Sequence, residues 1–415
     1  MGFIDFMTDY IKSGETNTRR LGLEIEHFVI DENGDQIGFE EVSELIDHIG
    51  NTIGARIIYM DGYPVGYYTG EYSISLEPAC QFEISINPYS DLNEIKRVYG
   101  DFRTLWDPIF EERGYRMVTK GNLPKVELGV ITPDEIPLSH KKRYKYMNDY
   151  FESSGRYGKY MMRASASAQI SVDYRSQEDM VRKLRVLQKI APILMILMES
   201  KSKPDSTLPG VNDRPHLLRI QEWDDLDSQR TGFVPSSFDD DFGYRKMAEV
   251  IYHMPLILLT ADGETTSVGS RSAADLVEQG IVNEGILTDE EKTALAEHFM
   301  SMAFFHFRIK KYIEIRVADS VPIEKALGYT ALIKGLIYSD SNLKALENEL
   351  SGIKTAEEIQ KNICEIERYG FKAEIYEGRT AGQWADHLID LAEGALSKDD
   401  KEYLDNVRAV WDICK

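Results

Sequence analysis

Cysteine is scarce in this chain of 415 residues, which contains only Cys80, Cys364 and Cys414. Their wide separation has none of the short spacings of a zinc site, and three thiols are too few for the disulfide framework of a secreted domain. The first residues contain acids and lack a basic segment followed by an apolar core, so we expect no secretory signal. These absences favour a reducing compartment, and we expect a cytoplasmic protein.

Positive charge and long apolar runs are also in short supply. Lysine and arginine number 48 against 70 acidic residues, which gives a net charge of -22. This excess of negative charge disfavours nucleic acid or an anionic membrane surface as the main partner, although a pocket can still present a positive local field to a small anion. The longest apolar run, residues 190–198, is far shorter than the ~20 residues that span a bilayer. We expect small-molecule partners, and the sequence leaves the oligomeric state open.

The segment 20–31, RLGLEIEHFVID, alternates like a β-strand but carries two carboxylates. In a strand, Glu24 and Glu26 share one face, while Leu23 and Ile25 lie on the other. Two unpaired carboxylates on a covered face would repel each other or force one to stay protonated. The pair therefore indicates either a solvated edge strand or a cation bound between the side chains, and this segment alone does not decide between them.

Three later segments, at 72–86, 168–174 and 307–317, repeat this division into a polar and an apolar face. Their polar faces carry Ser73, Ser75, Glu77, Gln81, Glu83, Ser85, Gln169, Ser171, Asp173, Arg308, Lys310, Tyr312, Glu314 and Arg316. We expect these strands to form one sheet with an apolar back packed on helices and a front of carboxylates and cations. Such a front suits a site that holds Mg²⁺ beside bound phosphate.

The rest of the chain is mostly helical in pattern, with further strands expected at 56–60, 115–119 and 256–259. Residues 61–70 predict a loop, and residues 201–241 lack periodicity, which is typical of functional or disordered segments. Helices are expected at 2–12, 39–49, 92–113, 138–152, 178–199, 272–279, 290–303, 323–338, 356–369, 381–396 and 399–413. Without repeats or a linker, this predicts one α+β catalytic domain, with a sheet-containing core over 1–340 and a helical cap over 341–415.

Five motifs occur in an order and spacing that resemble the plant and proteobacterial type of glutamate–cysteine ligase, which starts glutathione synthesis. They are RLGLEIEHFVI, ISLEPACQFEIS, MMRASASAQISVDY, QRTGFVPSSFDDDFGY and RIKKYIEIRVADS, and the resemblance covers about residues 19–340. The resemblance implies a fold similar to glutamine synthetase, in which a curved antiparallel sheet forms a funnel over the active site. It also implies a ligase that uses ATP and Mg²⁺ to phosphorylate the γ-carboxylate of L-glutamate, so that the amine of L-cysteine attacks the acyl phosphate.

The resemblance also implies roles for individual residues. The expected metal ligands are Glu24, Glu26, Glu77, Glu83 and Glu314. Glu26, Arg308 and Arg316 are expected to be catalytic, and Arg308 and Lys310 to contact ATP. Substrate binding is expected at Gln81, Arg163, Ser165, Gln169, Arg230 and Tyr312. For each arginine the alternative is an ordinary surface salt bridge.

Two positions depart from the family's pattern. Ala79-Cys80 stands where relatives have a glycine pair, and Cys80 is either a reactive thiol or a small buried hydrophobic group. Ala164 stands where the plant enzymes have an arginine, and on a strand the neighbouring Arg163 would face the other way. These departures leave the acceptor open between cysteine and another amino acid or amine. The remaining alternatives are a binding protein without turnover and a kinase of the same fold.

Overall fold

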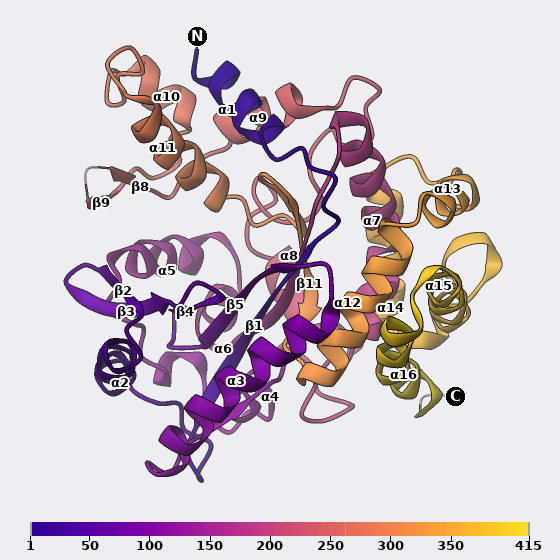
Figure 1. Cartoon of the computed structure of the whole chain (residues 1–415), viewed down its shortest axis with the longest axis horizontal. Helices are drawn as coiled ribbons and strands as arrows, with labels where there is room; N and C mark the ends of the chain where they lie inside the picture. The colour runs from indigo at the N-terminus through magenta and orange to yellow at the C-terminus, as the bar shows by residue number, and fades with distance from the viewer. Residues whose placement is uncertain (1, 262, 414–415) are drawn as a thin grey trace.

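The structure is a computed structural model that describes residues 2–261 and 263–413, and its centre is a nine-stranded antiparallel sheet (Figure 1). The strands follow the order β10, β11, β7, β1, β5, β4, β3, β2, and β6 pairs with β1. Their bounds are β1 (Leu21–Ile30), β2 (Arg56–Met60), β3 (Tyr63–Tyr68), β4 (Tyr72–Leu76), β5 (Phe82–Tyr89), β6 (Arg116–Val118), β7 (Ser167–Val172), β10 (Phe307–Ile309) and β11 (Ile313–Asp319). This architecture confirms the expected α+β class with a large antiparallel sheet.

Strand β1 is central because it pairs with β5, β6 and β7. The register places Glu26 opposite Glu83 on β5, and Glu24 opposite Gln169 on β7. Leu23 and Ile25, which alternate with the two glutamates, are fully buried. The predicted separation of β1 into a polar and an apolar face is therefore present.

Three long helices, α3 (Leu92–Glu111), α7 (Gln177–Leu197) and α12 (Ile323–Ile337), pack against strands of this sheet. Asp91 caps the first of these helices, since its side chain accepts a hydrogen bond from the backbone N–H of Asn93. From the same helix, the buried Trp106 packs edge-on against Phe82 of β5 and donates to the Tyr67 hydroxyl at 2.8 Å. Aromatic packing thus attaches this helix to the sheet.

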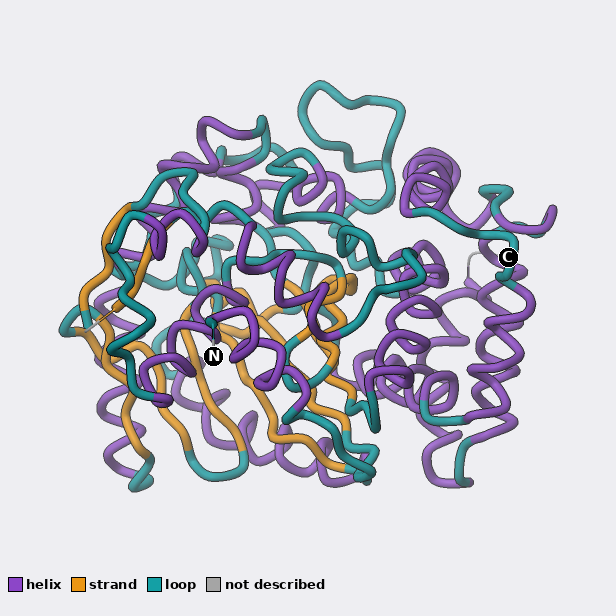
Figure 2. Tube along the Cα trace, turned by 90° about the horizontal axis from the view of Figure 1, so that it is seen from above, coloured by secondary structure: helices purple, strands orange, loops and turns teal. Residues whose placement is uncertain are grey.

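The other helices surround the sheet, and those after residue 340 pack on α7 and α12. Figure 2 shows those of the C-terminal part standing together at one side of the strands. Their bounds are α1 (Phe3–Lys12), α2 (Phe39–Thr52), α4 (Pro124–Glu127), α5 (Lys142–Ser154), α6 (Gly158–Ala164), α8 (Leu218–Asp224), α9 (Tyr244–His253), α10 (Ala273–Glu278), α11 (Asp289–Ser301), α13 (Asp340–Glu349), α14 (Ala356–Tyr369), α15 (Ala381–Ala395) and α16 (Lys398–Ile413). Within the described ranges, no helix has the length and apolar character needed to cross a membrane.

Two expectations about local structure were wrong. Residues 61–70, expected as a loop, contain strand β3, because Asp61 and Gly62 adopt φ values of +51° and +88° and turn the chain back onto β2. Residues 307–317, expected as one strand, form a hairpin of β10 and β11. A further small hairpin pairs β8 (Leu258–Ala261) with β9 (Glu264–Ser267).

The packing of α3 on the sheet gives a stability prediction. Trp106→Ala removes a fully buried indole and leaves a cavity, so we expect the free energy of unfolding to fall by about 3–5 kcal/mol. Val130→Ala is the control, because Val130 is 64% exposed and its truncation should change stability by less than about 0.5 kcal/mol. Urea unfolding followed by circular dichroism measures both, and equal midpoints for the two variants would contradict the packing described here.

Candidate active site

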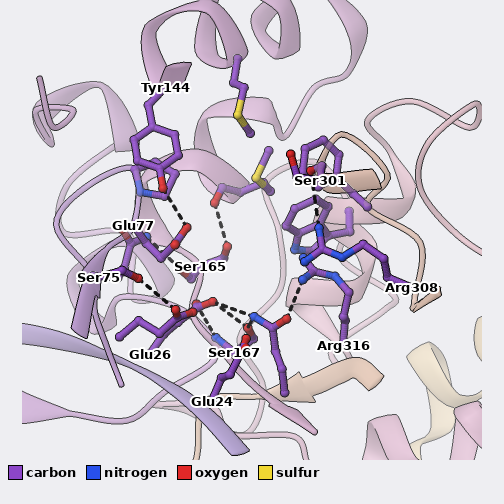
Figure 3. Close-up of a pocket in the computed structure, with 18 of the residues that line it drawn as sticks. Glu24, Glu26, Ser75, Glu77, Tyr144, Ser165, Ser167, Ser301, Arg308 and Arg316 are labelled. Atoms are coloured by element: carbon purple, nitrogen blue, oxygen red, sulfur yellow. Dashed lines mark hydrogen bonds between the residues drawn. The ribbon is translucent and has the colours of Figure 1, made fainter. Parts of the chain in front are cut away.

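A cavity of about 370 Å³ lies on the polar front of the sheet (Figure 3). Strands β1, β2, β4, β5, β7, β10 and β11 contribute side chains to it, and helices α5, α6, α8 and α11 contribute others. Most of the predicted site residues line this cavity, namely Glu24, Glu26, Glu77, Gln81, Glu83, Ser165, Gln169, Arg308, Lys310, Glu314 and Arg316. Segments almost 300 residues apart in sequence therefore meet at one place, as the face patterns predicted.

Four carboxylates form one side of the cavity. Burial, together with the neighbouring Glu314, raises the pKa of Glu24 to about 6. Burial and the nearby Glu77 raise the pKa of Glu26 to about 7. Burial and the surrounding acids also raise the pKa of Glu83 well above its usual range. Each of these three carboxyl groups therefore favours its protonated form unless a cation stabilises the charge.

Hydrogen bonds fix the orientation of these acids. Glu26 accepts from the backbone N–H of Ser167 at 2.7 Å and from its hydroxyl at 2.9 Å. Glu83 accepts from the hydroxyls of Ser75 and Ser85, each at 3.0 Å. Because the partners are neutral, they hold the carboxylates in place and leave their charge available to a cation.

Arginine and lysine form the opposite side of the cavity, around Glu314. Arg308 binds both oxygens of this carboxylate, at 2.5 and 3.0 Å, and Lys310 and Arg316 approach to 3.1 and 3.4 Å. Burial opposes ionisation of Glu314, but the three cations outweigh burial and hold its pKa well below the usual range. Arg316 also donates to Gln169 at 2.5 Å, which links the cationic side to the strand beside the carboxylates.

The donor set fits a Mg²⁺ ion that is shared with a ligand. Among the described residues, no group of three or more histidine, cysteine or acidic side chains is arranged to hold a metal ion. Mg²⁺ usually takes one or two carboxylates and completes its shell with phosphate oxygens and water. The hard oxygen donors of Glu24, Glu26, Glu77 and Glu83, which line one side of the cavity, suit this mode of binding. Glu314 differs from them, because its oxygens already face three cations, and its metal role stays a prediction.

Three predicted residues lie outside the cavity lining. Arg163 is on helix α6, not on a strand, and donates to Asn148 and to the carbonyl of Ile136. Arg230 is fully buried and pairs with Asp227 at 2.7 Å. Tyr312 lies in the turn between β10 and β11 and lines a separate depression, which it shares with Glu24.

Helices α5 and α8 supply cavity residues that the strand patterns did not reveal. Lys141, Arg143 and Tyr144 come from the start of α5, and Arg219 and Trp223 come from α8. The α5 residues could have been suspected from the sequence, because the predicted helix at 138–152 begins with several basic residues. The α8 residues were harder to find, because Arg219 lies in the aperiodic stretch 201–241 among other cations that do not line the cavity.

Arg219 has an incomplete set of hydrogen-bond partners. It is 3% exposed, and two of its nitrogens share the Arg316 carbonyl at 3.3 Å. The Nε atoms of Arg219 and Arg316 and the indole nitrogen of Trp223 are buried without a partner in the described structure. Buried donors are normally satisfied, so this group of N–H groups indicates a place for an anionic or carbonyl oxygen of a ligand.

The turn that carries Cys80 keeps the geometry that a glycine would favour. Cys80 has φ +64°, is buried, and burial raises the pKa of its thiol to about 12. Gln81 closes the turn by accepting from the Ala79 N–H and donating to the Ser165 carbonyl. These observations favour the small hydrophobic interpretation of Cys80 over a reactive thiol.

The fold and the cavity define a class of enzyme, the ATP-dependent carboxylate–amine ligases. The family model described as glutamate-cysteine ligase family 2 matches residues 20–375, and the chain belongs to this family. It is 26% identical over 402 residues to the chloroplastic glutamate–cysteine ligase of Medicago truncatula, covering 94% of this chain and 75% of the relative. Glutamate–cysteine ligase B, chloroplastic, of Oryza sativa subsp. japonica is 25% identical over 386 residues, covering 91% and 74%.

A solved structure is similar in fold. The glutamate–cysteine ligase of Francisella tularensis in complex with AMP superposes with a TM-score of 0.55 at 12% identity, over 97% of this chain and 84% of that one. At this identity the likeness concerns the fold alone. It confirms that the sheet and its helices belong to the glutamate–cysteine ligase architecture.

The raised pKa of Glu26 predicts how stability changes with pH. In the unfolded chain this carboxyl loses its proton near pH 4.5, whereas in the folded protein it keeps the proton up to about pH 7. The native state then binds more protons in this window, so ionisation of Glu26 lowers stability as the pH rises through it. Glu26→Gln removes this contribution, and its melting temperature should fall less between pH 5 and 7.5 than that of the wild type.

The exposed Glu44 supplies the control for this comparison. Glu44→Gln should follow the wild-type pH profile in thermal unfolding. Parallel profiles for all three proteins would show that Glu26 does not titrate in this range.

Proposed function

We propose that this protein joins the γ-carboxylate of L-glutamate to the amine of L-cysteine, with ATP and Mg²⁺, through a γ-glutamyl phosphate. The observation that carries the proposal is the opposition of four carboxylates and an arginine–lysine group across one cavity. Phosphoryl transfer needs both, because catalysis there depends on positioning and on neutralising negative charge. A γ-glutamyl ligase that uses another amino acid or amine is the second candidate, supported by the position of Ala164.

In the first step, a γ-carboxylate oxygen of glutamate attacks the γ-phosphorus of ATP, and ADP leaves. Glu24, Glu26, Glu77 and Glu83 would hold Mg²⁺ together with phosphate oxygens. When bound, Mg²⁺ would supply positive charge that offsets the negative charge of the phosphates and of the four carboxylates. Arg308, Lys310 and Arg316 would face the transferred phosphoryl group as fixed cations.

In the second step, the acceptor nitrogen attacks the acyl carbon and forms the amide bond. The phosphate leaves with the electron pair of the C–O bond, and the nitrogen loses a proton. The cations around Glu314 would stabilise the departing phosphate, because its charge grows as the bond breaks. Glu314 holds all three of them by ion pairs, so no motion of these side chains is needed during the reaction.

Glutamate itself needs a receptor for its α-carboxylate. We assign this role to Arg219 and Trp223, because their unpartnered N–H groups lie at the cavity next to Arg316. Two guanidinium donors and an indole donor suit a carboxylate, which accepts bonds at both oxygens. Gln169 and Ser165 lie on the same cavity wall and would contact the remaining polar groups of the substrate.

The helices after residue 340 are proposed as a cap of a single catalytic domain. Contacts of α15 and α16 with α12 support this assignment, as does the ion pair of Lys334 with Asp400 at 2.8 Å. Expression of residues 1–340 alone tests it, because the fragment lacks Ala392 and Val407, which pack against Gly335 and Gly328 of α12, and should be insoluble or unfolded.

Phosphate release with ATP, Mg²⁺ and L-glutamate tests the function directly. We expect release to depend on the acceptor, to be fastest with L-cysteine among a panel of amino acids and amines, and to yield a γ-glutamyl amide by mass. Preference for another acceptor would select the second candidate. ADP formation without any acceptor, accompanied by a stable phosphorylated product, would instead indicate a kinase, and no turnover by folded protein would indicate a binding role.

Glu26→Gln tests the carboxylate cluster. The amide keeps the size and the acceptor oxygen for Ser167 but removes the charge, so we expect turnover to fall by about 100-fold or more and the Mg²⁺ requirement to rise. Glu44→Gln is the matched control and should keep wild-type turnover. Unchanged activity of the Glu26 variant would remove this residue from the mechanism.

A further inference from the structure

The cavity contains six cationic side chains, and only some of these side chains form ion pairs with carboxylates. They are Lys141, Arg143, Arg219, Arg308, Lys310 and Arg316. The last three share Glu314. Lys141 is buried and donates to the Leu76 carbonyl at 2.5 Å. Among the described residues, Arg143 and Arg219 form no ion pair, although Glu77 acts on Arg143, and Glu26 and Asp319 on Arg219, at longer range.

Arg143 is bound only by neutral groups. Its Nη1 donates to the Ser301 hydroxyl at 3.2 Å, and its Nη2 lies 3.4 Å from the Ser301 carbonyl. Burial lowers the pKa of Arg143, and the nearby Tyr144 and Glu77 oppose this effect only in part. A guanidinium has five N–H donors in a planar fork, and a carboxylate or phosphate is its matching partner. Some N–H groups of the Arg143 guanidinium therefore remain available to bind an anionic ligand.

The position of Arg143 distinguishes it from Arg219. The Asp61 carboxylate, at the tip of the β2–β3 hairpin, accepts from the backbone N–H of Lys142 at 2.9 Å. This bond brings the neighbouring residues Met60 and Arg143 together, and both line the cavity. Met60 is 38% exposed, so this is the mouth of the cavity, whereas Arg219 is buried in its inner wall.

Three methionines line the cavity that Arg143 also lines. Met147 lies one helical turn after Arg143 on α5 and faces the same cavity, together with Met60 and Met161. Thioethers are polarisable and adapt to small apolar or sulfur-containing groups. A cation beside such a surface matches an α-amino acid with a small apolar or thiol side chain, and it gives no advantage to an amine without a carboxylate.

We propose that Arg143, supported by Ser301, binds the α-carboxylate of the acceptor and restricts acceptors to α-amino acids. The inference rests on the proposed ligase function and deepens it. Two amino-acid substrates bring two α-carboxylates, and the cavity has two unpaired guanidinium groups to receive them. Arg219, on the inner wall, serves the glutamate that enters first, and Arg143 serves the acceptor that arrives at the mouth.

Kinetics with a matched pair of acceptors test this assignment. L-cysteine and cysteamine differ only in the carboxylate, so the ratio of their kcat/KM values reports the carboxylate contact. We expect Arg143→Ala to lower this ratio by about 10- to 100-fold, the size of a lost charge-assisted hydrogen bond, and Arg143→Lys to restore part of it. If the panel of acceptors favours another amino acid, that acid and its decarboxylated amine replace the pair.

Arg219→Ala is the companion variant. It should raise the KM for L-glutamate and leave the cysteine-to-cysteamine ratio near the wild-type value. Melting temperatures of all variants check that the fold is retained, and because the readout is a ratio, a general loss of active protein cancels.

Several outcomes would overturn the inference. An unchanged ratio in Arg143→Ala would show that Arg143 does not contact the acceptor carboxylate. A rise in the KM for ATP, with the ratio constant, would assign Arg143 to a phosphate instead. Absence of turnover by the wild type would remove the proposed function and this inference with it, whereas wild-type turnover with an unchanged ratio removes only the inference.

Discussion

The repulsion between carboxylates on β1 and β5 is the constraint on which the site depends. The antiparallel register sets Glu26 directly opposite Glu83, and like charges in that position destabilise a sheet. The register is nevertheless held, because a shift by one residue would turn Leu23 and Ile25 to the polar front and the glutamates into the apolar back. Burial of the back face therefore forces the acids together, and their remaining charge is what a divalent cation would neutralise.

The cationic side chains of the β10–β11 hairpin lie on the opposite side of the cavity from these carboxylates. Glu314 provides each of them with a fixed partner, so Arg308 and Lys310 are held on their own side of the cavity. Without Glu314, long flexible side chains would be free to reach the carboxylates of β1 and fill the space between. The separation of the two charged sides is thus maintained by ion pairs inside one of them, and it leaves a cavity with room for a substrate that needs both.

Much of this front face could be predicted, because the two-residue period of a strand assigns faces without knowledge of the fold. Glu24, Glu26 and Gln169 share a face in the structure as in the pattern. In the segment 307–317 the predicted polar residues still share one face, although the segment forms a hairpin. The turn pairs Arg308 with Glu314, and the alternation of polar and apolar residues continues on the second strand. Strand β3 was missed because its Gly, Tyr and Pro content resembles a loop until a tight turn pairs it with β2.

The helical part of the cavity could not be predicted in the same way. Residues on α5 and α8 reach the site through tertiary packing, and nothing in a local pattern distinguishes a helix face that covers a sheet from one that covers a substrate. The choice of Arg230 over Arg219 illustrates this, because both lie in one aperiodic stretch. In the structure Arg230 pairs with Asp227 and stacks on Tyr150, away from the cavity, while Arg219 lines the cavity with its Nε unpartnered.

The two departures from the family's pattern differ in their consequences for the acceptor. At Cys80 the backbone adopts the left-handed conformation that a glycine would take, and Gln81 closes the turn with side-chain hydrogen bonds, so the change leaves the turn in place. At Ala164 the change removes a cation, and Arg163 does not replace it because the helix directs it to Asn148. The charge available to an acceptor on this side of the cavity then comes from α5. Acceptor choice in this chain therefore depends more on Arg143 and the methionines near it than on the turn beside Cys80.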